Sequence, residues 1–156
     1  METARILRVV PLFAGATDAQ LKAVSKVARL RRLKPGETVI REGEPGTSVY
    51  ILKSGSVSVA MSRRDDEAQV LAKLVPCDLF GEMAILDHTP RSATVTASEE
   101  TEVLEIPEPD LRRVLDADPD LALRVHRALA VIFCARLRAA NEKLLAWSSL
   151  PPEHGA

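Results

Sequence analysis

The spacing of hydrophobic and polar residues divides the chain into a helical segment, a region of short strands and a second helical region. Near the N-terminus, Thr17 and Gln20 have the spacing of a capping box, and apolar residues follow at helical intervals. This pattern predicts an amphipathic helix over residues 18–30. Residues 1–33 are therefore expected to form an N-terminal helical segment.

From residue 34 to residue 107, glycine or proline recurs at short intervals and separates short runs of residues that favour strands. The clearest runs are residues 38–40, 49–52, 56–59 and 93–96. Short β-rich runs that end in turn residues predict an all-β sandwich or barrel. The charged segment from Arg63 to Glu67 is typical of a solvated hairpin tip.

The pattern returns to helix after Pro107. Asp110 is expected to cap a short helix over residues 111–115. Asp118 followed by Pro119 predicts the start of a second helix, since proline is favoured at the first helical position. No glycine or proline follows until after Trp147, so this helix is expected to reach that residue and to be about 40 Å long.

The long helix is apolar on every face over residues 128–135, and a helix of this kind must be buried all round. Its own domain can cover only one side, so we expect a homodimer through the helix 119–147. The seam would consist of Leu121, Val125, Ala128, Ile132, Ala135 and Ala139, which have 4-3-4-3-4 spacing. The alternative is that the helix folds back onto its own sheet. Residues 148–156 contain two prolines and are expected to be a disordered tail.

Composition limits the functions that the chain can have. Its 156 residues include 21 basic and 22 acidic side chains, and only 3% are aromatic. Binding to nucleic-acid backbones needs clustered cations, and base stacking needs more aromatic rings than this chain has. No direct DNA binding is therefore expected. The length fits a single domain with a core that needs no disulfide.

Few residues suit metal or redox chemistry. Cys77 and Cys134 lie far apart and are expected to be buried free thiols in a reducing compartment. His88, His126 and His154 are isolated, so no metal site is expected, and no Ser/His/Asp arrangement can be assigned, so no enzyme is expected either. The chain has no membrane-length apolar run and no signal-peptide core, which predicts a cytoplasmic protein without a membrane partner.

Residues 80–95 combine several features that suit an anionic ligand. Gly81 permits close backbone approach, and the residues after it predict one helical turn whose free N–H groups can point at an anion. Arg91 offers a planar fork of donors for a phosphate, beside the hydroxyl of Ser92. Glu82 can accept hydrogen bonds from sugar hydroxyls. Together they indicate a nucleotide site, although each residue alone is more typical of a solvated surface.

The same segment resembles the phosphate-binding cassette of cyclic nucleotide-binding domains. Residues 80–86 read FGEMAIL, and residues 90–95 read PRSATV. Further matches lie upstream, in the family's order, at residues 10–13, 35–46 and 50–57, so the resemblance covers residues 6–147. It implies one domain over residues 1–147 with an α+β fold. An eight-stranded antiparallel β-roll (a double-stranded β-helix, or jelly roll) would occupy residues 34–107, after an N-terminal helical segment and before C-terminal hinge and long lid helices over residues 108–147.

The resemblance also implies roles for individual residues. Glu82 would bind the ribose 2′-hydroxyl, and Arg91 would bind the cyclic phosphate. Further contacts would come from Phe80, Gly81, Met83, Ala84, Ser92 and Ala93 in the cassette, and from Leu71 and Leu74, which would line the base pocket. The sequence departs from the family's pattern at the base contact, because the stretch of the long helix that brings a Thr-Ser pair to the base in a family member has Arg136 here. The chemistry of Arg136 suits stacking on a purine or donating to guanine acceptors; the alternative is that it lies on a solvated flank.

The resemblance implies a cyclic nucleotide as the ligand, with cAMP favoured and cGMP as the second candidate, and no metal. Transcription factors of this superfamily continue into a helix-turn-helix domain, whereas this chain ends soon after the long helix. The leading hypothesis is a stand-alone sensor that signals through its C-terminal helix to a dimer or to a separate, unidentified protein effector. The alternative is a protein-interaction module that has the fold and uses no ligand.

Overall fold

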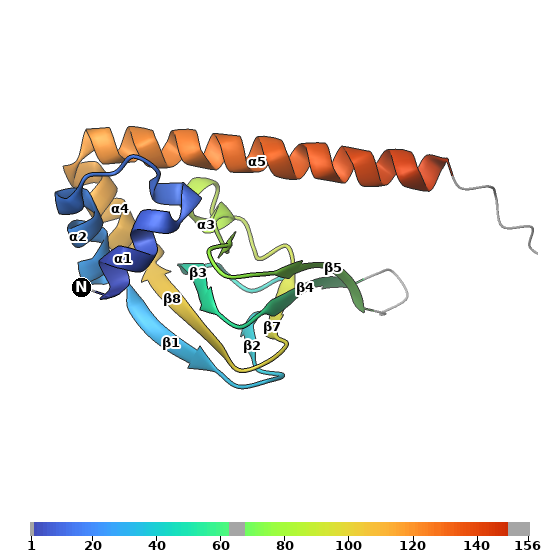
Figure 1. The fold of residues 1–156 in the computed structure, drawn as a ribbon. Helices are drawn as coiled ribbons and strands as arrows, with labels where there is room; N and C mark the ends of the chain where they lie inside the picture. The colour runs from blue at the N-terminus through green and yellow to red at the C-terminus, as the bar shows by residue number, and fades with distance from the viewer. Residues whose placement is uncertain (1, 63–67, 150–156) are drawn as a thin grey trace, which may run out of the picture.

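The computed structural model describes residues 2–62 and 68–149. The predicted hairpin tip from Arg63 to Glu67 and the predicted tail from residue 150 onward lie outside these residues. Within them, two four-stranded antiparallel sheets form a roll, and helices from both ends of the chain gather beside it (Figure 1). The predicted α+β fold with an antiparallel β-roll is confirmed.

The N-terminal helices are α1 (Glu2–Val9), the 3-10 helix η1 (Pro11–Phe13) and α2 (Asp18–Val27). The strands are β1 (Arg29–Leu33), β2 (Thr38–Ile40), β3 (Ser48–Ser54), β4 (Val57–Ser62), β5 (Ala68–Leu74), β6 (Leu79–Phe80), β7 (Thr94–Ala97) and β8 (Thr101–Pro107). The short helix α3 (Met83–Leu86) lies between β6 and β7, and α4 (Glu108–Ala117) and α5 (Pro119–Ser148) follow β8. One sheet has the strand order β1-β8-β3-β6, and the other has the order β2-β7-β4-β5.

The predicted capping box at the start of α2 is present. The Thr17 hydroxyl accepts from the Gln20 N–H at 3.2 Å, and the Gln20 side chain accepts from the Thr17 N–H at 2.9 Å. The helix ends at Val27, earlier than predicted, because β1 begins at Arg29 and pairs along its length with β8. The roll therefore begins inside the segment 1–33 that the sequence predicts to be helical.

The sheet β1-β8-β3-β6 lies between two hydrophobic cores. One of its faces, which includes Ile51 and Leu104, packs against α1, α2, α4 and α5. The opposite face, which includes Tyr50 and Leu52, packs inside the roll with residues of the second sheet such as Val95. Because side chains alternate between the two faces of a strand, β3 is buried at each of its first five positions.

α4 begins directly after Pro107, so the prediction that Asp110 caps it is wrong. Asp110 lies in the first turn and forms an ion pair with Arg113. The helix can begin ahead of Pro109 because a proline in the first turn of a helix leaves no intrahelical hydrogen bond unmade.

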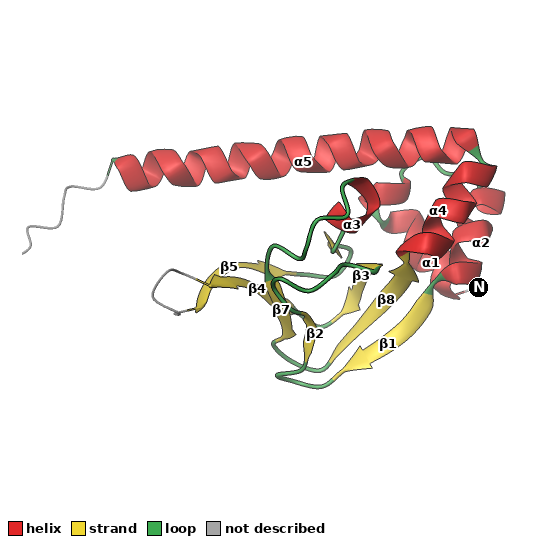
Figure 2. Ribbon diagram, turned by 180° about the vertical axis from the view of Figure 1, so that it is seen from behind, coloured by secondary structure: helices red, strands yellow, loops and turns green. Residues whose placement is uncertain are grey.

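α5 begins as predicted, with Asp118 as its N-cap and Pro119 as its first residue. The Asp118 carboxylate accepts a hydrogen bond from the Leu121 N–H at 3.1 Å. The helix ends at Ser148, one residue beyond the predicted end. Its far half extends past the other helices and runs above β4 and β5, as the views from both sides show (Figures 1 and 2).

The predicted dimer seam on α5 is wrong over its first half. Its first four members, Leu121, Val125, Ala128 and Ile132, belong to or border the core that α5 shares with α1, α2 and α4. This part of the helix therefore follows the alternative, in which it packs on its own domain, because the neighbouring helices already cover that face. The last two members, Ala135 and Ala139, are exposed in the single chain.

The prediction that both cysteines are buried is also wrong. Cys77 is half-buried in the turn after β5, with a positive φ of 76°, and Cys134 is exposed on α5. Both are free thiols. In the part of the chain that the structure describes, no helix combines the length and the apolar character that crossing a membrane requires.

Candidate functional site

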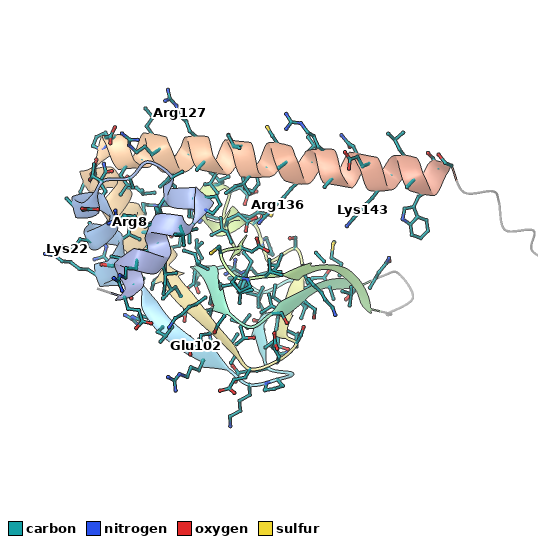
Figure 3. All side chains as sticks on the ribbon, viewed as in Figure 1. Arg8, Lys22, Glu102, Arg127, Arg136 and Lys143 are labelled. Atoms are coloured by element: carbon teal, nitrogen blue, oxygen red, sulfur yellow. The ribbon has the colours of Figure 1, made fainter. Side chains whose placement is uncertain are left out.

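A cavity of about 600 Å³ lies between the roll and α5. This volume is in the range that proteins use for small-molecule ligands. Its walls come from β2, β4, β5 and β6, from the segment around α3, from the loop that leads into β7, and from one face of α5. Most of the lining is apolar, and Figure 3 shows Arg136 and Lys143 pointing from α5 towards the roll.

The backbone at Gly81 requires a glycine. Gly81 follows β6 and has a positive φ of 75°, a conformation that residues with a Cβ rarely adopt. A Cβ built on it would lie 2.9 Å from Arg91 Nη1 and 3.0 Å from the Ser48 carbonyl oxygen. The chain then enters α3 at Glu82. Glycine at this position therefore lets the cassette backbone approach the Arg91 side chain closely.

The Arg91 guanidinium is held in the cavity wall by two backbone carbonyls. Nη1 donates to the Gly81 oxygen at 3.0 Å, and Nη2 donates to the Ser48 oxygen at 2.7 Å. Two backbone hydrogen bonds of 2.8 Å join Arg91 to the turn at Gly43 and Glu44. Burial lowers the pKa of Arg91, but an arginine remains charged near neutral pH. The group is therefore an oriented positive charge facing an otherwise mainly apolar cavity.

Glu82 is buried, with 6% of the residue exposed, and its carboxylate forms an ion pair with Arg136 of α5. Arg136 Nη2 also donates to the Leu79 carbonyl oxygen at 2.7 Å. Burial lowers the pKa of Arg136, and the negative charge of Asp78 opposes this shift. These contacts join α5 to the cassette, and 43% of the Arg136 side chain remains exposed.

The structure brings most of the predicted site residues to the same cavity. Its lining includes Leu74, Phe80, Gly81, Glu82, Met83, Arg91, Ser92, Ala93 and Arg136. The Ser92 hydroxyl also donates to the Met83 sulfur at 3.9 Å. The side chains of Leu71 and Ala84, which were predicted with them, lie outside the described part of the structure.

Sequence reasoning missed the rest of the α5 wall. Ala139, Ala140 and Lys143 line the cavity together with Arg136. These four positions have the i, i+3, i+4, i+7 spacing of one helix face, so Arg136 could have identified the others. Ala139, which was predicted to lie in a dimer seam, instead faces the cavity.

The described residues include no group of three or more His, Cys, Asp or Glu side chains that could hold a metal ion. Two of the histidines make local contacts: His88 Nε2 accepts from Arg112 at 2.6 Å, and His126 Nδ1 lies 2.6 Å from the Ala122 carbonyl oxygen.

Comparison with known proteins gives matches over most of the chain. The family model described as the cyclic nucleotide-binding domain matches residues 30–118. A CRP-like cAMP-activated global transcriptional regulator of Mycobacterium tuberculosis is 31% identical over 139 residues, which cover 89% of this chain and 60% of that protein. A cGMP-dependent protein kinase of Toxoplasma gondii is 39% identical over 114 residues, which cover 73% of this chain and 11% of the kinase. The chain therefore spans less than two thirds of the length of either relative.

Among solved structures, the N-terminal domain of a transcriptional regulator from Streptomyces coelicolor A3(2) superposes with a TM-score of 0.73 and 32% sequence identity. The match covers 97% of this chain and 99% of that one. The similarity therefore extends to the N-terminal helices and α5 as well as to the roll.

Proposed function

The chain belongs to the cyclic nucleotide-binding domain family, and we propose that it is a non-catalytic sensor that binds a purine cyclic nucleotide in the cavity between the roll and α5. The observation that carries this proposal is the placement of Arg91. Two carbonyls orient its guanidinium in the wall of a largely apolar cavity, and they use two of its five N–H donors. The remaining donors can bind the oxygens of a cyclic phosphate.

Glu82 is the proposed partner of the ribose 2′-hydroxyl. Its carboxylate lies at the cavity wall beside Gly81, one residue before α3. A carboxylate accepts hydrogen bonds but cannot donate them when ionised, so it suits a sugar hydroxyl. Ser92 and the backbone at Met83 would add polar contacts near the phosphate, and Phe80 and Ala93 would add apolar ones.

The base is proposed to lie between α5 and the strands β4 and β5. Val59, Ala72 and Leu74 line the cavity on the strand side and suit aliphatic contact with a purine. Sequence reasoning favours cAMP. One relative is named for cAMP and the other for cGMP, which supports a purine in either case.

The proposed signal passes through α5. Arg136 pairs with Glu82 in the structure, so a ribose hydroxyl and the helix compete for, or share, the same carboxylate. A ligand that binds one arrangement of the helix more tightly shifts the population towards that arrangement. The effector would be a dimer partner or a separate protein. A ligand-free interaction module is the less favoured alternative, because it does not explain an oriented arginine in a cavity of ligand size.

For the dimer, we propose the outer face of α5 in place of the predicted seam. Leu123, Leu137 and Leu144 lie at heptad spacing and are 50%, 62% and 67% exposed. Ala130 completes the repeat, and Cys134 lies between it and Leu137. Apolar side chains at this spacing suit packing against a second helix.

Titration calorimetry of the wild-type chain with cAMP, cGMP and 5′-AMP tests the ligand. We expect a cyclic nucleotide to bind, and 5′-AMP to bind at least about tenfold more weakly because its phosphate is not held against the ribose. Arg91→Ala should weaken binding by about 30-fold or more, since the ligand phosphate would be buried without its positive partner. Arg138→Ala, an exposed position on α5, is the matched control. No binding of either cyclic nucleotide at about 1 mM would reject the sensor.

Sedimentation velocity tests the dimer. We expect wild type to sediment as a dimer at tens of micromolar and Leu137→Glu as a monomer. In a Cys77→Ser background, mild oxidation should cross-link two chains through Cys134. A wild-type chain that sediments as a monomer would reject this part of the proposal and leave the ligand site unaffected.

A further inference from the structure

Glu105 on β8 connects to Arg91 through two separate routes beneath the cavity. We infer that Glu105 is a positioning residue for Arg91. Glu105 fixes the two backbone carbonyls that orient the Arg91 guanidinium. The consequence for ligand affinity rests on the proposed function, whereas the effect on Arg91 itself does not.

The first route passes through Ser48. This residue is 4% exposed, and its carbonyl oxygen accepts from Arg91 Nη2 at 2.7 Å. Its side-chain hydroxyl donates to Glu105 Oε1 at 3.1 Å. Ser48 is the first residue of β3, beside the glycine-rich turn, where strand pairing alone restrains the backbone least. The Glu105 carboxylate therefore restrains the residue that supplies one of the two carbonyls.

The second route passes through Tyr50 and Phe80. The Tyr50 hydroxyl donates to the same oxygen, Glu105 Oε1, at 3.2 Å. The Tyr50 ring stacks on Phe80 with 5.0 Å between ring centroids and 8° between the planes, and the two residues are paired in register. Phe80 immediately precedes Gly81, whose carbonyl oxygen accepts from Arg91 Nη1 at 3.0 Å. Both carbonyls thus depend on one carboxylate oxygen.

Burial raises the pKa of Tyr50, and the negative charge of Glu105 raises it further, so the hydroxyl remains a donor at neutral pH. Glu105 itself is not among the residues that line the cavity. Its second oxygen, Oε2, lies 3.8 Å from Arg31 Nη1 on β1. Glu105 therefore acts on Arg91 through neutral groups, and the positive charge of Arg91 remains available to a ligand.

Such support matters because Arg91 lies in the loop before β7, outside any strand. A long side chain that is not already ordered must lose conformational freedom when it binds, and this weakens the complex. We therefore expect Glu105→Met, which keeps the length and removes the acceptor, to weaken cyclic nucleotide binding by about 3–10-fold. Glu105→Gln keeps an acceptor oxygen for both hydroxyls and should restore most of the affinity.

Glu102→Met is the matched control. Glu102 lies on the same strand, but its carboxylate pairs with Lys53 and Arg32 and, among the described residues, forms no hydrogen bond with Ser48 or Tyr50. Affinity in this variant should equal that of wild type. Equal losses in the Glu105 and Glu102 variants, or an affinity of Glu105→Met within about 1.5-fold of wild type, would overturn the inference.

A second readout needs no ligand. In ¹⁵N relaxation measurements on the ligand-free protein, the Arg91 Nε–H group should be nearly as ordered as the backbone in wild type and Glu102→Met, and markedly more mobile in Glu105→Met. If Glu105→Met does not fold, Tyr50→Phe and Ser48→Ala each remove one route and should each give part of the effect. An Arg91 signal that is unchanged in these variants overturns the inference. If it does change while no cyclic nucleotide binds, the positioning role stands and the proposed function fails.

Discussion

The two halves of α5 belong to one uninterrupted helix, yet their apolar residues face different surroundings. In the first half, Leu121, Val125 and Leu129 are at most 1% exposed and complete the core beneath α1, α2 and α4. In the second half, Leu144 and Trp147 are 67% and 69% exposed. The buried apolar residues of the first half therefore belong to the domain's own core. The exposed ones, which include Leu123 and Val131 in the first half as well as Leu144 and Trp147 in the second, need a ligand or a second copy to explain them.

The inner face of the second half does contact the domain, but through polar groups. Arg136 reaches Glu82 and the Leu79 carbonyl oxygen, and Ala139 and Ala140 line the cavity beside it. The first half is thus held by packing, and the second by contacts in which a ligand can take part. This difference makes the second half the part of the helix that is suited to respond to a ligand.

The largest expected effect comes from truncating one leucine in each half of α5 and comparing the losses of stability. Leu129→Ala removes a side chain that is 1% exposed and should lower the free energy of unfolding by about 2–5 kcal/mol. Leu144→Ala, at a position that is 67% exposed, should change it by less than about 0.5 kcal/mol in the monomer. Urea denaturation at low protein concentration measures both. Similar losses in the two variants would show that the halves are not held differently.

The next test removes the polar link. In Arg136→Ala, amide hydrogens of residues 137–147 should exchange about tenfold faster, because the second half loses its ion pair and its hydrogen bond to the roll. Exchange in residues 121–132 should not change. Arg138→Ala, at an exposed position two residues away, is the control. Faster exchange along the whole helix would mean that the two halves open together.

The same contrast explains how much could be predicted from the sequence. The cassette was predictable because its signals lie close together in the chain: Gly81, Glu82 and Arg91 fall within eleven consecutive residues, and each has a distinct chemistry. Gly81 adopts a positive φ, which its missing Cβ permits. The cassette wall of the cavity could therefore be named residue by residue.

The α5 wall could be predicted only in part. A helix that is apolar on every face gives no periodic signal to show which side its own core covers, so Leu121 and Val125 were assigned to a dimer. Lys143 shares a helix face with Arg136, but that this face meets a cavity follows from the path of the helix over β4 and β5, which is a property of tertiary packing. Glu105 was missed for a similar reason, since its contacts join residues more than fifty positions apart in the chain.

A smaller effect is expected where α5 begins. Asp118→Ala removes the side chain that accepts from the Leu121 N–H and should cost about 1 kcal/mol of stability. Asp116→Ala, at an exposed position with no ion pair among the described residues, should have almost no effect. Thermal denaturation followed by circular dichroism measures both variants. An Asp118→Ala chain as stable as Asp116→Ala would mean that packing alone fixes the start of the helix.

The smallest effect concerns pH. Asp120, in the first turn of α5, accepts from Gln20 at 2.9 Å and from Arg124 at 2.9 Å, and these hydrogen bonds lower its pKa. Because the pKa is lower in the folded chain than in the unfolded one, the stabilisation is present above about pH 4 and is lost as the pH falls through the folded value. The difference in Tm between wild type and Asp120→Asn should therefore be constant from about pH 5 to 7 and shrink towards pH 2. A difference that does not vary with pH would show that the Asp120 charge contributes nothing. The matched control is Asp116→Asn, at an exposed position on α4, against which the pH profile of Asp120→Asn is compared.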